Sequence, residues 1–351
     1  MAQRRASRQV RVGSVAVGGD APIVVQSMLS TDTRDVPTSL EQIMRLHQAG
    51  CELVRIAVPH ADALEGFAAL VAQSPLPVVA DIHFDYKLAL GALERGAAKL
   101  RINPGNMPRM ADVDAVLDAA GQAGVPIRIG VNAGSLAKDF AERADMTLAE
   151  KLVASALSYA EHCEKRGLSD LVLSVKASSV PVTVDAYRAL AARCDYPLHI
   201  GVTEAGTWER GTVKSAVGLG ILLAEGIGDT LRVSLTADPV REVEVAWRIL
   251  EALDLRRHGP ELISCPTCGR TEIDLMGIAA EVEERLKGLS SDVKVAVMGC
   301  VVNGPGEARE ADFGIAGGRG MGMIFAKGRT LRKVPESELV DALFEEIEKA
   351  R

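Results

Sequence analysis

Short apolar runs alternate with longer amphipathic stretches over most of this chain. From residue 23 to about residue 255, each run of aliphatic and β-branched residues is followed by a stretch whose apolar positions recur every three or four residues. The first pattern is typical of buried strands and the second of helices packed on one face. The expected strands are 23–28, 53–58, 78–83, 99–103, 127–132, 171–177, 198–203 and 230–235, and the clearest helical stretches are 39–49, 86–95, 147–166 and 239–253.

The alternation contains eight strand–helix units over about 230 residues, the number and size that close a parallel barrel. Several helices end in glycine, which readily adopts the left-handed conformation of a helix C-cap. The sequence therefore predicts an α/β fold with a (β/α)8 TIM-type barrel. A doubly wound open sheet is the alternative, but it would require a glycine-rich phosphate loop after the first strand, and Gln26-Ser27-Met28 supplies none. The glycines in question are Gly50, Gly96, Gly124, Gly167 and Gly226.

The two ends of the chain have different patterns. Residues 10–17, the turn Gly18-Gly19-Asp20 and the apolar run from Ile23 predict an N-terminal hairpin that can plug one end of the barrel. After residue 255 a polar linker, 256–260, leads to short strands and two helices, typical of a small α+β domain. We expect one domain over 1–255 and a second over 256–351. The strands expected in the second are 262–264, 293–298, 313–316 and 322–326, and the helices are 275–286 and 336–349.

Composition argues against several classes of protein. The 351 residues are 48% hydrophobic and 25% charged, as in ordinary globular proteins. A net charge of −7 and an aromatic content of 3% argue against nucleic-acid binding. No apolar run is long enough to cross a membrane, and the basic first residues lack the apolar segment of a secretory signal. Six cysteines are too few for a disulfide scaffold of this size, so we expect a cytoplasmic protein.

Polar and basic residues gather where the expected strands end. Side chains two apart on a strand share a face, so Asp81 and His83 point the same way, as do the polar pairs on other strands. In a barrel that direction is inward, at the mouth where catalytic groups collect. Burying several cations together is costly unless an anion meets them, so the pattern predicts a strongly anionic ligand such as a diphosphate. The candidate ligand-binding residues are Arg55, Asp81, His83, Arg101, Asn103, Arg128, Asn132, Lys176, Thr203, Arg232 and Ser234.

The alternative for these cations is structural pairing with carboxylates. Only Asp81 and Glu204 stand out in the sequence as neighbouring anions at the strand ends. Two carboxylates cannot neutralise four arginines and a lysine, so the ligand interpretation is favoured.

Three cysteines mark a second candidate site. Cys265 and Cys268 are separated by two residues, so both thiolates can reach one metal centre, and Cys300 follows the strand 293–298. Three thiolates and a nearby carboxylate can hold zinc or a four-iron cluster, and the spacing leaves both open. A redox disulfide is less favoured because of the third cysteine beside a glycine-rich loop. The remaining cysteines, Cys51, Cys163 and Cys194, are interpreted as buried or half-buried residues without a chemical role.

Segments 264–270 and 298–307 resemble the cluster loops of the hydroxymethylbutenyl diphosphate synthase family. Segments 25–28, 81–84, 101–106 and 174–178 are also similar to that family, in the same order along nearly the whole chain. The short linker leaves no room for the extra domain that some members insert, so the chain resembles the two-domain bacterial form.

The resemblance implies a 4Fe-4S cluster held by Cys265, Cys268, Cys300 and Glu307. It implies that the barrel binds 2-C-methyl-D-erythritol 2,4-cyclodiphosphate and opens its ring with two electrons and loss of water, in the methylerythritol phosphate route to isoprenoids. Glu204, Glu307 and Asn303 are the expected catalytic residues, with Glu204 as the acid if its site is closed. Flavodoxin or ferredoxin would supply the electrons.

A homodimer is also expected. In a β/α barrel each helix returns the chain to the face opposite the mouth, so the last helix delivers the linker far from the candidate ligand site. A head-to-tail dimer, in which each cluster domain caps the partner's barrel, resolves this, and family members are similar in this respect.

Two other functions fit the residues. One is an iron–sulfur electron carrier or sensor that only binds a phosphorylated ligand, and the other is a zinc-dependent phosphosugar lyase or aldolase. A brown colour bleached by reductant would exclude zinc.

Overall fold

The computed structural model describes residues 3–107, 109–134, 136–289, 291–300 and 311–350. It divides into two compact units, Met1–Arg256 and Arg257–Arg351. Each unit has its own hydrophobic core.

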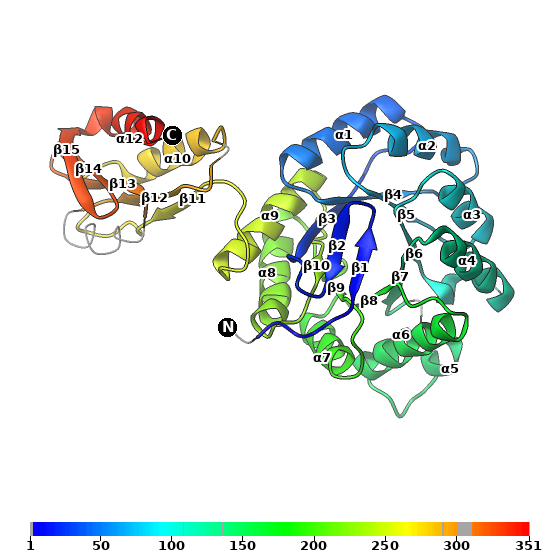
Figure 1. Ribbon diagram of the computed structural model, residues 1–351. Helices are drawn as coiled ribbons and strands as arrows, with labels where there is room; N and C mark the ends of the chain where they lie inside the picture. The colour runs from blue at the N-terminus through cyan, green and yellow to red at the C-terminus, as the bar shows by residue number, and fades with distance from the viewer. Residues whose placement is uncertain (1–2, 108, 135, 290, 301–310, 351) are drawn as a thin grey trace. The chain divides into compact units, whose positions relative to one another are not determined.

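The first unit is a nearly closed barrel of eight parallel strands, in the order β8-β7-β6-β5-β4-β3-β10-β9 (Figure 1). An isolated bridge from Leu173 to Leu198 links the first and last strands of this order. The TIM-type barrel predicted from the strand–helix alternation is thus confirmed. Its strands are β3 (Val24–Met28), β4 (Leu53–Ala57), β5 (Val78–Asp81), β6 (Lys99–Ile102), β7 (Ile127–Asn132), β8 (Leu171–Lys176), β9 (His199–Ile200) and β10 (Thr230–Leu231).

Helices surround the strands (Figure 1). Their ends follow local chemistry: Thr147 and Glu150 form a capping box at the start of α6, and Gly124, with φ +63°, ends α4. None of the described helices combines the length and apolar character needed to cross a membrane. The helices are α1 (Val36–Gln48), α2 (Ala63–Gln73), α3 (Tyr86–Glu94), η1 (Pro104–Asn106), α4 (Met110–Ala123), α5 (Lys138–Ala141), α6 (Leu148–Lys165), α7 (Val180–Ala191), α8 (Trp208–Ala224) and α9 (Pro239–Ala252).

Strands β9 and β10 are two residues each, much shorter than the predicted 198–203 and 230–235. The chain turns soon after β9, where Glu204 has a positive φ of 51°. Tyr187 of α7 fills the weak seam beside β9: its hydroxyl donates to the His199 carbonyl (2.6 Å) and accepts from the Val175 N–H (3.3 Å). Side-chain packing therefore completes the barrel where strand pairing is shortest.

The N-terminal hairpin pairs β1 (Gln9–Val12) with β2 (Val15–Gly18). Its turn lies at Gly13-Ser14 and not at Gly18-Gly19-Asp20, so the predicted turn position was wrong. Gly13 has φ +57° and packs against Pro77 and Ala98, which precede β5 and β6. The hairpin therefore covers the amino-terminal end of the barrel, as a plug.

The second unit is a mixed five-stranded sheet in the order β11-β12-β13-β14-β15. The β11–β12 and β12–β13 pairs are parallel, and the others are antiparallel. Strand β15 was not predicted, because its mostly exposed, charged residues show no apolar alternation. The elements are β11 (Glu261–Ser264), α10 (Leu275–Leu286), β12 (Lys294–Met298), β13 (Phe313–Gly318), β14 (Met321–Ala326), β15 (Arg329–Pro335), η3 (Glu336–Glu338) and α12 (Leu339–Lys349).

Candidate active site

Charged side chains from neighbouring strands meet inside the carboxyl end of the barrel. Strand register sets Arg101 of β6 opposite both Asp81 of β5 and Arg128 of β7, and sets Lys176 of β8 opposite Asn132. Arg55 of β4 joins them. Asp81, Arg101, Arg128 and Lys176 are at most 8% exposed, and Arg55 is 9% exposed. The structure thus places these predicted residues together and away from water.

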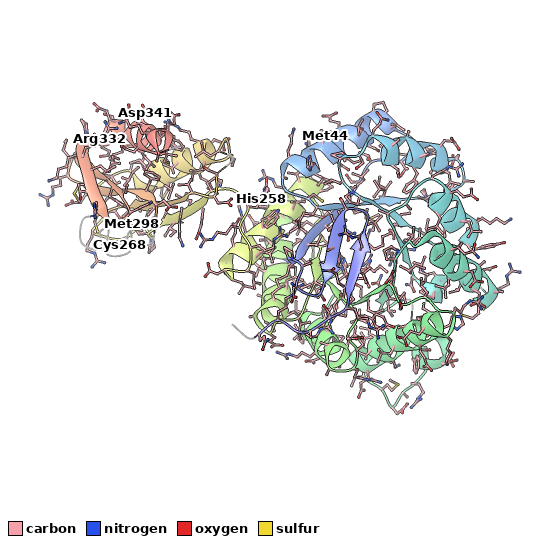
Figure 2. All side chains as sticks on the ribbon, viewed as in Figure 1. Met44, His258, Cys268, Met298, Arg332 and Asp341 are labelled. Carbon is pink, nitrogen blue, oxygen red and sulfur yellow. The ribbon has the colours of Figure 1, made fainter. Side chains whose placement is uncertain are left out.

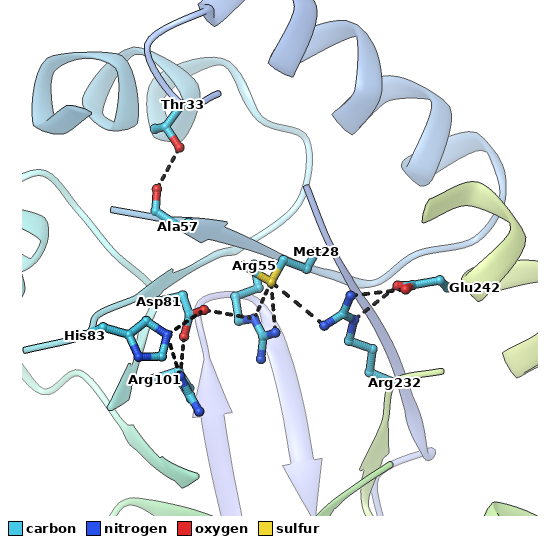
Figure 3. A network of polar contacts seen from close by, with 9 residues as sticks. All are labelled: Met28, Thr33, Arg55, Ala57, Asp81, His83, Arg101, Arg232 and Glu242. Carbon is cyan, nitrogen blue, oxygen red and sulfur yellow. Dashed lines mark hydrogen bonds and ion pairs between the residues drawn. The ribbon is translucent and has the colours of Figure 1, made fainter. Parts of the chain in front are cut away.

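Asp81 is the centre of one network (Figure 3). Its carboxylate accepts a hydrogen bond from Arg101 Nη1 at 3.1 Å and lies 3.7 Å from Arg55 Nε and 3.5 Å from His83 Nε2. The His83 ring nitrogen is also 2.9 Å from Arg101 Nη1. Burial alone would raise the pKa of Asp81, but Arg55, the His83 hydrogen bond and Arg101 together hold it well below its usual range. Asp81 is therefore an anion at neutral pH.

Glu242 of α9 is the centre of the second network (Figure 3). It receives Arg232 Nε and Nη2, both at 3.1 Å, together with the Ser27 hydroxyl at 3.0 Å and the Leu235 N–H at 3.0 Å. The sequence patterns did not single out this residue. The available signal was a glutamate on the buried face of an amphipathic helix, where it is only 3% exposed.

Glu204 does not take the part of the second anion that the sequence suggested. It is exposed, in a turn after β9, while Glu242 neutralises Arg232. The expectation that Asp81 and Glu204 are the neighbouring anions of the cations is corrected to Asp81 and Glu242.

Met28 separates two of the guanidinium groups. Its sulfur accepts from Arg55 Nη2 at 2.8 Å and lies 3.8 Å from Arg232 Nη1. Burial lowers the pKa of Arg55 to about 10, and the neighbouring Arg232 and Arg101 add to this against the opposing effect of Asp81. A thioether is a weak acceptor, so it orders these cations without neutralising them.

Positive charge remains in excess in the described part of the barrel. The Nε atoms of Arg101 and Arg128 are buried and have no hydrogen-bond partner among the described residues. Burial, followed by the neighbouring arginines, lowers the pKa of Arg128 and of Lys176 well below their usual values. Such a site favours an anion with several oxygens, because arginine forks match phosphate oxygens and lysine adds a point charge.

Two glycines make room for the cations. A Cβ atom on Gly130 would lie 3.0 Å from Arg101 Nε, and one on Gly201 would collide with Lys176 Nζ and lie 2.7 Å from the Arg232 carbonyl. The missing side chains therefore allow cationic groups to occupy the barrel interior.

The other predicted residues lie around this cluster. Asn103 is buried, and its side-chain oxygen accepts the Gly105 N–H at 3.2 Å to start η1. Asn132, Thr203 and Ser234 are half-buried at the ends of β7, β9 and β10 or just beyond them.

The three candidate ligand cysteines, Cys265, Cys268 and Cys300, lie in the second unit. Cys265 directly follows β11 and Cys300 follows β12, the parallel neighbour of β11. Gly299 N–H donates to Cys265 Sγ at 3.2 Å, which brings the first thiol beside the backbone of the third. Hydrogen bonding from the Arg270 backbone lowers the pKa of Cys268, against burial, which acts to raise it. Figure 2 labels Cys268 and, at the carboxyl end of β12, Met298.

These thiols fit thiolate ligation in their chemistry. A donated N–H stabilises a sulfur anion, and such hydrogen bonds are characteristic of iron–sulfur sites. As the side chains stand, no three His, Cys, Asp or Glu groups of the described residues are close enough to share a metal ion. Holding one therefore requires the three thiols to turn toward a common point. Glu307 and Asn303 lie outside the described residues.

The other cysteines differ from these three. Burial raises the pKa of Cys51 and of Cys163 to about 12, and it also raises the pKa of the half-buried Cys194. They are poorly suited to thiolate chemistry at neutral pH.

Two protein families match the chain. The family described as "GcpE TIM-barrel domain" matches residues 7–247, and "GcpE protein C-terminal domain" matches residues 261–349.

Full-length relatives are also similar. The "4-hydroxy-3-methylbut-2-en-1-yl diphosphate synthase (flavodoxin)" of Geobacter sulfurreducens is 60% identical over 343 residues, which cover 98% of this chain and 97% of the relative. Proteins of the same name from Lawsonia intracellularis and Clostridium acetobutylicum are 55% and 54% identical, each over 99% of this chain and 97% and 99% of the relative.

Solved structures show the fold alone. A dihydropteroate synthase from Stenotrophomonas maltophilia has a TM-score of 0.53 and 16% identity, covering 70% of this chain and 99% of its own. The Yersinia pestis enzyme of the same name has a TM-score of 0.51 and 14% identity, covering 70% of this chain and 97% of its own.

Proposed function

Because the chain belongs to the family of 4-hydroxy-3-methylbut-2-en-1-yl diphosphate synthases, we propose that it makes this diphosphate from 2-C-methyl-D-erythritol 2,4-cyclodiphosphate. Two electrons and accompanying protons open the ring and release one water. The protein is thus an oxidoreductase of the methylerythritol phosphate route to isoprenoids.

The excess of buried positive charge at the barrel mouth is the observation that carries this proposal. Arg55, Arg101, Arg128 and Lys176 are neutralised only in part, by Asp81. A ligand with two phosphates supplies the missing negative charge and the forked oxygens that arginine prefers. The barrel is therefore the substrate-binding domain.

Cys265, Cys268 and Cys300, with Glu307, would hold a 4Fe-4S cluster in the second unit. When bound, the cluster would relay the electrons of the external donor one at a time and would offer an electrophilic iron with an exchangeable ligand. A carboxylate is more easily displaced from iron than a fourth thiolate, which suits Glu307. The lowered pKa of Cys268 and the N–H donated to Cys265 prepare two of the thiolates.

Glu204 is the expected proton donor to the departing hydroxyl. It follows β9 in a turn, with a positive φ of 51°, and its side chain is exposed. Asn303, three residues after Cys300 in the sequence, is the remaining expected catalytic residue.

The relatives' name specifies flavodoxin, and we propose flavodoxin or ferredoxin as the electron donor here. The six cysteines are free thiols in the structure, and a reducing cytoplasm would keep the ligand thiols available.

We further propose that two chains share each active site. Arg256 is tied to the amino-terminal end of the barrel: its Nη1 lies 2.7 Å from Glu52, just before β4, and its guanidinium lies 4.7 Å from the Trp247 ring centroid. Eight residues, 257–264, then precede Cys265 and span ~28 Å at most. The 14 residues of α9 already cover about 21 Å of barrel height. A cis route around the rim would be taut, whereas a two-fold dimer lets each second unit reach the partner's mouth.

The test uses anaerobically prepared protein with the cyclodiphosphate and reduced flavodoxin. We expect a brown protein that forms the linear diphosphate. Cys300→Ser should lose iron and activity together, and Cys194→Ser should keep both. Full iron content in Cys300→Ser would contradict the ligand assignment, and absence of product from iron-loaded wild type would contradict the reaction.

A further inference from the structure

Lys99 lies inside the barrel beneath the candidate diphosphate site. It is on β6, two residues before Arg101 and therefore on the same face of the strand. The side chain is 0% exposed, and its Nζ has no hydrogen-bond partner among the described residues. A fully buried, unpaired lysine is rare and costly, so its placement requires an explanation.

Cations dominate the surroundings of Lys99. Asp81 is already engaged by Arg55 and Arg101. His199 is fully buried, and burial and the nearby cations hold its pKa well below its usual value, so its ring is neutral. The charges that act directly on Lys99 are those of Arg128 on β7 and Arg55 on β4. Other buried or half-buried titratable groups of the described barrel strands and the helices against them include Asp81 on β5, Arg101 on β6, Lys176 on β8, His199 on β9, Arg232 beyond β10, Tyr187 on α7 and Glu242 on α9.

As a result, the charged and the neutral form of Lys99 are close in free energy near neutral pH. Burial, with the charges of Arg128 and Arg55, lowers the pKa of Lys99 to about 7. At pH 8 about nine-tenths of such a group is neutral. An added negative charge in the same low-dielectric interior favours the ammonium form, because opposite charges attract strongly there.

We propose that Lys99 is a positioning residue whose ammonium form is disfavoured in the free protein and which takes up a proton when a diphosphate enters the barrel mouth. The inference rests on the proposed function for the identity of the ligand. Protonation places a further positive charge beneath the phosphates without requiring the free barrel to bury it. Ligand affinity is therefore coupled to proton uptake and weakens as the pH rises above 7.

The substrate itself contributes no proton in this range. Each phosphorus of the cyclodiphosphate is esterified and lies within the ring, so neither phosphate has the second ionisation near pH 6 that a phosphate monoester has. Any proton taken up from the buffer on binding is therefore bound by a group of the protein.

Titration calorimetry of the oxidised, cluster-loaded enzyme with the cyclodiphosphate tests this, because no turnover occurs without reductant. Comparing two buffers of different ionisation enthalpy gives the protons taken up per site. We expect Lys99 to contribute about 0.9 proton at pH 8 and about 0.1 at pH 6, from its pKa of about 7. Lys99→Met should lose that contribution and flatten the pH dependence of affinity.

Lys87 of α3 is exposed, so Lys87→Met is the matched control and should keep the wild-type uptake. Lys99→Gln provides a second neutral variant if the methionine packs poorly. Proton uptake in both Lys99 variants equal to that of wild type would overturn the inference. No binding to wild type at any pH would instead overturn the proposed function.

Discussion

Asp81 and Glu242 each neutralise arginines inside the barrel. The cations that neither carboxylate pairs with indicate that the ligand is an anion. Asp81 lies between Arg55 and Arg101, and Glu242 holds Arg232. Arg128 and Lys176 have no carboxylate within ion-pair distance among the described residues. A buried charge without a partner is costly, so these two residues are the strongest local indication of an anionic ligand.

Replacing a mouth cation should weaken substrate binding and leave the cluster spectrum intact. Arg101→Ala, Arg128→Ala and Lys176→Ala should each cost about 1.5–3 kcal/mol of binding free energy, because each removes a charge-assisted hydrogen bond. Calorimetry measures the affinity. Arg188→Ala is the control, since Arg188 pairs with Glu225 on the outer helices. Wild-type affinity in all three mouth variants would exclude this site.

Lys99 should also make stability depend on pH. Its pKa is lowered to about 7 in the folded chain, so between pH 7 and the ordinary lysine value the unfolded state binds more protons. The destabilisation is therefore complete below pH 7 and disappears as the pH rises toward about 10.4.

Lys99→Met should accordingly be more stable than wild type at pH 7, by about 1–4 kcal/mol. The difference should shrink toward pH 10. Urea unfolding of the two proteins at several pH values measures it, and a difference that stays constant with pH would contradict the assignment.

Among the elements, α9 makes polar contacts with the barrel interior through Glu242, in addition to its apolar packing. Glu242 connects this helix to β3 through Ser27 and to the segment after β10 through Arg232 and Leu235. The helix thereby fixes the position of an arginine that faces the mouth.

Glu242→Ala should destabilise the barrel by about 1–3 kcal/mol, because it leaves the half-buried Arg232 guanidinium and the Ser27 hydroxyl without their partner. Glu244→Ala on the same helix removes only a partly exposed pair with Arg241 and should change stability little. Denaturant unfolding of both variants is the measurement. Equal stabilities would show that Arg232 finds another partner.

For the whole molecule, the contacts of Arg256 with the amino-terminal end of the barrel support the proposed dimer. If two chains share each site, an inactive cluster variant and an inactive barrel variant should complement one another. Mixed dimers of Cys300→Ala with Glu204→Gln contain one intact site and should recover up to about half of the wild-type activity per mixed dimer. Glu204→Gln alone should lower turnover more than substrate binding.

Activity measured after subunit exchange is the readout, and native mass spectrometry can verify that mixed dimers form. Inactive mixed dimers built from folded variants would show that each site is completed within one chain.

Much of this architecture follows from local patterns. Apolar periodicity located β7 and α10 at their observed bounds, and alternation along the strands placed Arg101 and Lys176 on inward faces. These properties are readable because a strand or helix records in its own residues which face is buried. The spacing of Cys265 and Cys268 likewise identifies a donor set, because two thiols so close along the chain can reach one metal centre.

Tertiary structure decided what depends on contacts between distant segments. The hairpin turn at Gly13 depends on packing against Pro77 and Ala98, and the charged strand β15 exists because β14 offers it an edge. The pairing of Glu242 with Arg232 and the isolation of Lys99 also require the closed barrel. A linear pattern shows that a side chain is buried, but only the folded chain determines which charge lies beside it, because Coulomb energies depend on distance in space.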